Sequence, residues 1–208
     1  MHTLYMTPST CALATLIALE EAGAPYRTVL IDFASDAQRS PEYLSINPKG
    51  RVPALVTDQG VLTETPALLA YVAQRFPGAG LAPLDDPFAF GRVQEFNSYL
   101  CSTVHIAHAH RMRGYRWADD VAALEAMQRK VPQSVTEAFL LIEDGMLASP
   151  WVIGEAYSIA DPYLFTLAQW LEADGADTTR LPRILDHRRR MSERPAVYRA
   201  LAAEAALR

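Results

Sequence analysis

The sequence predicts an α/β domain followed by an all-helical domain. Signals for strands and helices alternate over residues 1–78, whereas only helical periodicity is found over residues 87–208. Prolines and glycines cluster between Phe76 and Pro87, which predicts a linker over residues 79–86. We therefore expect two domains, 1–78 and 87–208, joined by this linker.

The first domain begins with a strand, a helix and a second strand. Thr3–Met6 is a short strand that ends before Pro8, and Cys11–Ala22 has apolar residues on one helical face. Gly23 stops this helix, and the β-rich run Tyr26–Ile31 follows it. Two strands joined so closely through a helix predict a parallel βαβ unit.

A hairpin and a helix complete the first domain. Ser40 begins a brief helical turn, and Ala54–Thr57 is the next strand. The turn Asp58–Gly60 joins it to Val61–Thr63, which predicts an antiparallel pair. Thr65–Phe76 is the following helix. The order βαβ then ββα predicts a thioredoxin-like layout.

The second half carries the helical signals, expected at 87–115, 120–147, 158–174, 181–193 and 196–206. Pro132 is expected to kink the second of these helices. Ser158 and Asp161 have the spacing of a capping box, in which the serine caps the N–H three residues on and the acid reaches back. We assign this motif a role in folding rather than in chemistry.

The composition narrows the class of protein. The chain has 208 residues, of which 50% are hydrophobic and 21% charged, so it can bury a substantial core. A net charge of −5 argues against a nucleic-acid partner, which requires a basic surface. No stretch of 18 apolar residues and no signal sequence is found, so we expect a cytoplasmic protein without a membrane partner. Cys11 and Cys101 form no zinc or CxxC pattern and are expected to be reduced.

The stretch from Asn47 to Leu55 is the most informative part of the sequence. Its Val52-Pro53 step enters a strand, and proline suits the first residue of a strand because it cannot donate to the ladder. If this peptide bond is cis, the backbone N–H and C=O of Val52 become available to an extended peptide. Glu64 and Thr65 then place a carboxylate and a hydroxyl at a helix start, a site suited to a small zwitterion.

Together with Leu4–Ala14 and Ser158–Thr166, these motifs resemble the cytosolic glutathione transferases over essentially the whole chain, and the bacterial beta class in particular. The resemblance implies the glutathione transferase fold, a homodimer, glutathione as co-substrate and no metal. It implies that Arg51, Val52, Pro53, Glu64 and Thr65 bind glutathione, with Pro53 cis and with Glu64 and Thr65 at the γ-glutamyl end. It also implies that Cys11 faces the sulfur and that the second domain contributes His105.

Cys11 is the foremost catalytic candidate. A thiol at a helix N-terminus meets unpaired N–H groups and the positive end of the helix dipole, which favour the thiolate. The alternative is a small buried hydrophobe. The family pattern usually continues with serine, whereas this chain has Ala12, so Ser9 and Thr10 are the nearby hydroxyl donors, and Thr7 is a further one.

His105 is the second candidate, and the alternative is a half-buried helix histidine bonded to a carbonyl. Cys101 lies one helical turn before it and either lines the same cleft or packs in the core. His105, His108 and His110 invite a metal hypothesis, but no further ligand joins them at a suitable spacing, so we expect no metal.

A basic cluster is formed by Arg111, Arg113 and Arg116. One interpretation is that it binds an acidic substrate or the carboxylates of glutathione. The other is that it is a solvated face or an interface. Many family members use a lysine in the loop after the second strand to contact glutathione. Here the loop Phe33–Ser40 has only Arg39. Tyr5, inside the first strand, is expected to have a core or cleft-wall role.

Three functions are consistent with these residues. The first is conjugation, in which the glutathione thiolate attacks a small hydrophobic electrophile, as in detoxification. The second is reduction of a disulfide or peroxide with Cys11 as the nucleophile. The third is a non-catalytic binding protein, for which the departures at Ala12 and in Phe33–Ser40 leave room. The sequence does not identify the electrophile.

Overall fold

The computed structural model describes residues 1–207 and forms two compact units. One contains Met1–Phe90 together with the segment from Met191 onward, and the other contains Gly91–Arg190. The α/β unit followed by a mostly helical region confirms the predicted fold class. The segment from Met191 onward, which was expected in the second domain, groups with the α/β unit.

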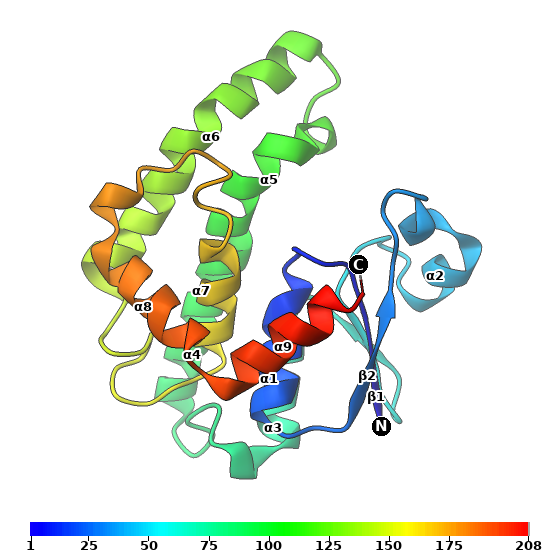
Figure 1. The fold of residues 1–208 in the computed structure, drawn as a ribbon, viewed down its shortest axis with the longest axis vertical. Coiled ribbons are helices and arrows are strands. Elements are labelled where there is room, and N and C mark those ends of the chain that lie inside the picture. The colour runs from blue at the N-terminus through cyan, green and yellow to red at the C-terminus, as the bar shows by residue number, and fades with distance from the viewer. Residues whose placement is uncertain (208) are drawn as a thin grey trace. The chain divides into compact units, whose positions relative to one another are not determined.

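The α/β unit is built on a four-stranded mixed sheet (Figure 1). Its strands are β1 (His2–Met6), β2 (Tyr26–Leu30), β3 (Ala54–Val56) and β4 (Val61–Thr63), in the order β2-β1-β3-β4. β1 pairs with β2 in parallel, and β3 pairs antiparallel with both β1 and β4. The predicted βαβ unit and hairpin are therefore confirmed.

The helices of this unit are α1 (Ala12–Glu21), α2 (Pro41–Ile46), α3 (Thr65–Arg75) and α9 (Pro195–Ala205). Leu4 and Met6 are fully buried, and Tyr5, which alternates with them, packs its ring 5.8 Å from that of Tyr43 in α2. Because successive strand residues point to opposite faces, α2 lies on the face opposite Leu4 and Met6. Tyr5 is thus part of the packing of the sheet, as expected.

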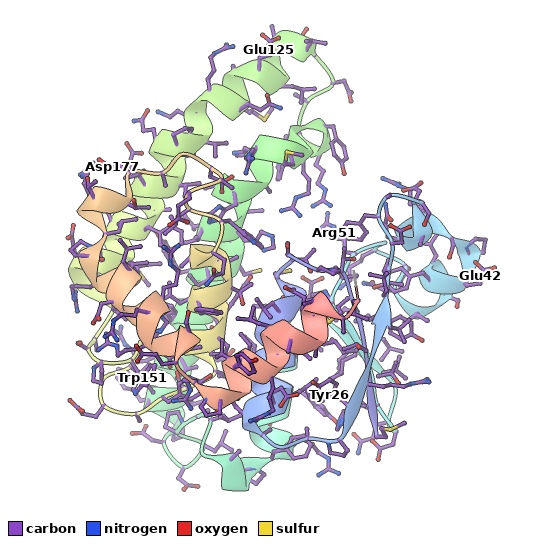
Figure 2. The ribbon with its side chains drawn as sticks, in the orientation of Figure 1. Tyr26, Glu42, Arg51, Glu125, Trp151 and Asp177 are labelled. Atoms are coloured by element: carbon purple, nitrogen blue, oxygen red, sulfur yellow. The ribbon has the colours of Figure 1, made fainter. Side chains whose placement is uncertain are left out.

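Helix α9 lies alongside α1 (Figure 1). Arg194 donates to both carboxylate oxygens of Glu21, at 2.5 and 3.0 Å, and Arg199 donates to Glu20 at 2.6 Å. Glu20 also accepts a hydrogen bond from Tyr26 of β2, which is labelled in Figure 2. These contacts join the last helix of the chain to its first.

The helical unit contains α4 (Pro87–Tyr99), α5 (His105–Arg113), α6 (Val121–Leu141), α7 (Ala160–Ala168) and α8 (Pro182–Ser192), of which α4 begins and α8 ends just outside the unit. The two predicted long helices are present, but each contains a π-helical segment, at Leu100–Val104 and Ile142–Met146. The helix predicted over 158–174 ends earlier, because the N–H of Gln169 is shared between two carbonyls and the chain then turns. Among the described residues, no helix is long and apolar enough to cross a membrane.

The capping box at the start of α7 is present in altered form. Asp161 accepts from the N–H of Ser158 at 2.7 Å, as predicted, and also from Val152 N and His187 Nε2 at 2.9 Å each. The hydroxyl of Ser158, however, accepts from the N–H of Ala160, two residues on, and not from that of Asp161. The motif acts as a buried structural junction.

A second buried carboxylate, that of Glu143, caps α8 from another part of the chain. Its two oxygens accept from the backbone N–H groups of Arg183 and Ile184 at 2.8 and 2.9 Å. A carboxylate at a helix N-terminus is favoured by the unpaired N–H groups and by the helix dipole. Arg183 returns the contact by donating to the carbonyl of Glu143.

Candidate functional site

The thiol of Cys11 contacts the loop that contains Pro53. Cys11 directly precedes α1 and is only 8% exposed. Its Sγ donates to the carbonyl oxygen of Val52 at 3.7 Å. The fold therefore joins the two most informative parts of the sequence, the start of α1 and the Val52-Pro53 step, although they lie about forty residues apart.

The loop before Cys11 is held by its own hydrogen bonds. Ser9 has the left-handed backbone angle φ +61°, and its N–H donates to Glu204 Oε1 at 3.1 Å. Thr10 donates its hydroxyl to the carbonyl of Thr7 at 2.6 Å and accepts from Ala12 N at 3.4 Å. The hydroxyl hydrogen of Thr10 is thus used within the loop. Sequence reasoning missed Glu204 altogether.

The Val52-Pro53 peptide bond is cis, as predicted. The preceding carbonyl, that of Arg51, accepts from Tyr43 Oη and from Asn47 Nδ2, each at 2.6 Å. Burial raises the pKa of Tyr43 to about 12, so this hydroxyl remains a donor at neutral pH. Two buried side chains from α2 and its C-terminal end therefore fix the backbone just before Val52.

A pair of opposite charges lies at the start of α3. Glu64 has φ +75°, and its carboxylate accepts from Lys49 Nζ at 2.5 Å. Lys49 also donates to Thr63 Oγ1 at 2.6 Å. Thr65, the first residue of α3, is buried. This arrangement offers an anion, a cation and the N–H groups of a helix start to one small ligand.

Sequence reasoning also missed Lys49, because it sought a lysine in the loop Phe33–Ser40. A signal was present in the predicted hairpin. Ala54 pairs with Thr63, so the residues before β3 and those after β4 meet at one end of the hairpin. Glu64 directly follows Thr63, and Lys49 precedes Ala54 in the loop that enters β3.

His105 belongs to the helical unit, whereas Cys11 belongs to the α/β unit. Within its unit, His105 Nε2 lies 3.3 Å from Arg113 Nη2, and its ring is 5.4 Å from that of Trp170. Cys101 is half-buried in the π-helical segment before it, and no disulfide joins it to Cys11.

The three histidines of α5 make different contacts. The Nδ1 atom of buried His108 pairs with Asp174, and the ring of His110 packs 4.7 Å from that of Trp117. Within residues 1–207, no three His, Cys, Asp or Glu side chains gather in a way that would hold a metal ion.

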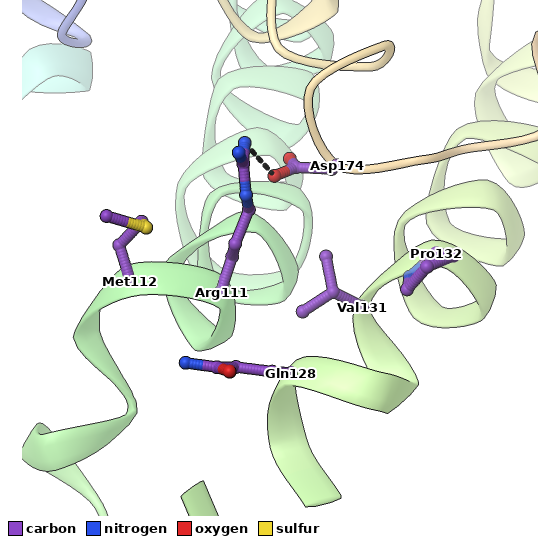
Figure 3. A pocket seen from close by; sticks show the side chains of 6 residues that line it. All are labelled: Arg111, Met112, Gln128, Val131, Pro132 and Asp174. Atoms are coloured by element: carbon purple, nitrogen blue, oxygen red, sulfur yellow. Dashed lines mark hydrogen bonds and ion pairs between the residues drawn. The ribbon is translucent and has the colours of Figure 1, made fainter. Parts of the chain in front are cut away.

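A shallow pocket of about 300 Å³ opens in the helical unit. It is lined by Arg111, Met112, Gln128, Val131, Pro132 and Asp174 (Figure 3). The guanidinium of Arg111 reaches Asp174 at 3.2 Å, so the charge at this pocket is partly neutralised. The predicted basic cluster is divided, since Arg111 pairs with Asp174, Arg113 lies at His105 and Arg116 ends a short 3₁₀ turn.

Comparisons with known proteins point to one family. The family described as "Glutathione S-transferase, N-terminal domain" matches residues 1–74. Glutathione S-transferase GstA of Escherichia coli O157:H7 is 32% identical over 204 residues, which cover 97% of this chain and 98% of that protein. A maleylacetoacetate isomerase of Pseudomonas aeruginosa is 27% identical over 205 residues, covering 96% and 92% of the two chains.

Among solved structures, a glutathione transferase homologue from Sulfitobacter with bound glutathione superimposes with a TM-score of 0.94 at 45% identity. The match covers 100% of this chain and 99% of that one. A relative above 30% identity that is matched over nearly its whole length, together with this structural likeness, settles the family. The chain belongs to the glutathione S-transferase family.

Proposed function

We propose that this protein is a glutathione transferase that binds glutathione in its α/β unit and activates the thiol for attack on a small hydrophobic electrophile. The observation that carries the proposal is the contact between Cys11 Sγ and the carbonyl of Val52. It places a thiol at a helix start beside a backbone segment suited to an extended peptide. The relative solved with bound glutathione supports the same ligand here.

The α/β unit supplies complementary groups for the peptide backbone and the γ-glutamyl end of glutathione. The backbone of Val52, flanked by Arg51 and Pro53, pairs with the extended peptide. The carboxylate of Glu64 takes the ammonium of the γ-glutamyl end, while Thr65 and the first N–H groups of α3 take its carboxylate.

Lys49 adds a positive charge at the same place. Its present contact with Glu64 keeps both charges satisfied until the zwitterion enters.

Activation requires a thiolate on glutathione at neutral pH. A free thiol has a pKa of about 8.5, and lowering it by about two units requires about 2.7 kcal/mol. The dipole of α1 and hydrogen bonds at its start, beside Cys11, supply stabilisation of this size. The glutathione sulfur then forms a bond to the electrophilic carbon, and the leaving group departs with the bonding electron pair. We assign His105 a contribution from the helical unit.

The helical unit is proposed to bind the electrophile. Its pocket combines the apolar side chains of Met112, Val131 and Pro132 with the polar ends of Arg111 and Gln128. Asp174 completes the lining, so apolar and polar side chains contribute equally, which suits a small molecule with both an apolar part and a polar group. We further propose a cytoplasmic homodimer with a role in detoxification.

Reduction of a disulfide by Cys11 is the second candidate function, because the residue in the site is a cysteine and not a tyrosine or serine. The Cys11 thiolate attacks one sulfur of the substrate disulfide, and the other sulfur leaves as a thiolate. A glutathione thiolate then attacks the substrate sulfur of the mixed disulfide and releases the Cys11 thiolate. A second glutathione attacks the glutathione sulfur of the resulting disulfide, which releases the substrate thiol and oxidised glutathione. A glutathione-dependent isomerisation is suggested by the isomerase relative. A non-catalytic binding protein remains the alternative if glutathione is bound without turnover.

Replacement of Cys11 by alanine separates these functions. Conjugation of glutathione to chlorodinitrobenzene is expected to survive in part in Cys11→Ala, whereas disulfide exchange is expected to vanish. Cys101→Ala is the matched control, since it removes the other thiol of the chain and should leave both activities intact. Loss of conjugation and of exchange together in Cys11→Ala, with glutathione binding retained, would instead make Cys11 the obligatory nucleophile.

A further inference from the structure

Helix α9 reaches the catalytic loop from the far end of the sequence. Glu204, in the last turn of α9, is only 5% exposed, and its Oε1 accepts from the N–H of Ser9 at 3.1 Å. Ser9 lies two residues before Cys11 and 195 positions away from Glu204. A buried carboxylate is retained in a protein interior only where donors satisfy it, and the N–H of Ser9 is one such donor.

Polar residues of α9, together with Arg194 just before it, contact α1 and the loop before it from one end to the other. Arg194, Arg199 and Glu204 are spaced five residues apart, and they contact Glu21, Glu20 and Ser9 respectively. The two arginines therefore bind the C-terminal end of α1, where the helix dipole favours their positive charge. Glu204 lies at the opposite end, next to Cys11, where the dipole favours a negative charge.

The contact acts on a backbone that does not adopt its conformation by default. The φ of +61° at Ser9 lies in the left-handed region, which residues with a side chain rarely occupy and which must be held by surrounding contacts. Thr10 follows immediately, with its hydroxyl bonded to Thr7, and then Cys11, with its thiol at Val52. Any relaxation at Ser9 is therefore passed directly to the thiol.

We propose that Glu204 is a positioning residue for the thiol site. By accepting from the N–H of Ser9, it holds the left-handed turn and so keeps Cys11 buried against the carbonyl of Val52. The last helix thereby controls the accessibility and geometry of a thiol at the start of the chain. The consequence for catalysis rests on the proposed function, whereas the consequence for Cys11 itself does not.

The test is the rate at which iodoacetamide alkylates each cysteine, followed by mass spectrometry of the intact native protein and its peptides. A buried thiol reacts through local opening, so its rate reports the equilibrium between closed and open loop. In Glu204→Ala the hydrogen bond to a charged acceptor is lost, and Cys11 should react about tenfold faster. Cys101, in the other unit, serves as the internal reference and should keep its rate.

Two conservative variants separate positioning from charge. Glu204→Gln keeps an acceptor at the same reach without the charge, and should raise the Cys11 rate by no more than about threefold. Glu204→Asp keeps the charge but withdraws it by one methylene, and should approach the rate of the alanine variant. These two variants also provide the test if Glu204→Ala does not fold.

Removal of the ion pair at the other end of α1, by Arg194→Met, is the matched control. It should lower the stability of the protein without accelerating the alkylation of Cys11. An unchanged Cys11 rate in both Glu204→Ala and Glu204→Asp would overturn the proposal. Equal acceleration of the alkylation of Cys11 and Cys101 would also overturn it, because it would indicate general loosening of the protein. Faster alkylation of Cys11 in Glu204→Gln than in Glu204→Asp would overturn it as well, because it would indicate an effect of charge.

Turnover with glutathione and chlorodinitrobenzene is the second readout. Glu204→Asp, which shortens the side chain, should lower kcat/KM more than Glu204→Gln, which keeps its length. If the wild-type protein shows no turnover, the proposed function fails, while the alkylation rates still decide whether Glu204 positions Cys11.

Discussion

The carbonyl of Arg51 offers a direct test of how the glutathione-binding loop is held. It accepts two hydrogen bonds, from Tyr43 Oη and Asn47 Nδ2, each 2.6 Å long, and both donors are at most 3% exposed. Tyr43→Phe removes one donor and Asn47→Ala removes the other. We predict that either single change leaves the carbonyl with one donor, whereas the double change leaves it with neither of them.

The magnitudes follow from the difference between losing a hydrogen bond and leaving a polar group without one. Tyr43→Phe should cost about 1 kcal/mol, the usual net contribution of a hydrogen bond. Asn47→Ala should cost more, because Asn47 Oδ1 also accepts from Lys49 N. The double variant should exceed the sum of the two by about 1 kcal/mol, because the carbonyl then lacks both of the buried donors that hold it. The contact of Asn47 with Lys49 is lost in both Asn47→Ala and the double variant, so it cancels when the four free energies of unfolding are compared in a double-mutant cycle.

Urea unfolding of the four proteins measures this coupling, and glutathione binding by the same proteins reports its effect on the site. The double variant should bind glutathione more weakly than either single variant, since Val52 follows Arg51 directly. Strictly additive free energies of unfolding, together with unchanged glutathione affinity, would refute the idea that these two donors jointly hold the loop.

Three further predictions concern the same structure. Gly50→Ala should cost about 1–2 kcal/mol in urea unfolding, because Gly50 has φ +60° and the new Cβ would lie 3.1 Å from the carbonyl oxygen of Gln38; Gly78→Ala, which meets nothing within 4 Å, is the control and should be near neutral. Glu143→Ala should cost about 3 kcal/mol by the same assay, because two backbone N–H groups lose a buried charged acceptor, and a loss below about 1 kcal/mol would contradict the capping role. Burial and the bond to Glu20 raise the pKa of Tyr26, so the unfolded chain loses this proton first and stability should fall as the pH rises above about 10; Tyr26→Phe should flatten that fall, and an unchanged pH profile would argue against it.

Structural features that depend on residues close together in the chain could be predicted from the sequence. The parallel pairing of β1 with β2 follows from the short βαβ connection, and the antiparallel pairing of β3 with β4 follows from the tight turn. The cis bond at Pro53 was expected from the family resemblance and not from the residues alone. The altered capping box at Ser158 was predictable in type but not in detail. The hydroxyl of Ser158 accepts from the N–H that the turn brings closest. The shape of this turn depends on the hydrogen bonds that Val152 and His187 donate to Asp161.

The parts that depend on tertiary packing could not be predicted. Glu204 and Ser9 are separated by almost the whole chain, and no local pattern marks one as the partner of the other. The predicted hairpin brings the chain before β3 towards the start of α3, but the contact of Lys49 with Glu64 also depends on the path of the loop between Lys49 and Pro53, which no local pattern fixes. The π-helical segments within the long helices add one residue to a turn where packing requires it, and helical periodicity does not detect such an insertion.

The most direct test of the central claim is calorimetric titration of glutathione into the wild-type protein and into Glu64→Gln at neutral pH under reducing conditions. We expect one glutathione per chain, bound by the wild-type protein with a Kd of about 1 mM or lower. Glu64→Gln should bind about tenfold more weakly, because the ammonium group of the ligand loses its charged partner. An absence of binding by the wild-type protein would contradict glutathione as the ligand. Equal affinities of the two proteins would contradict the site at the start of α3.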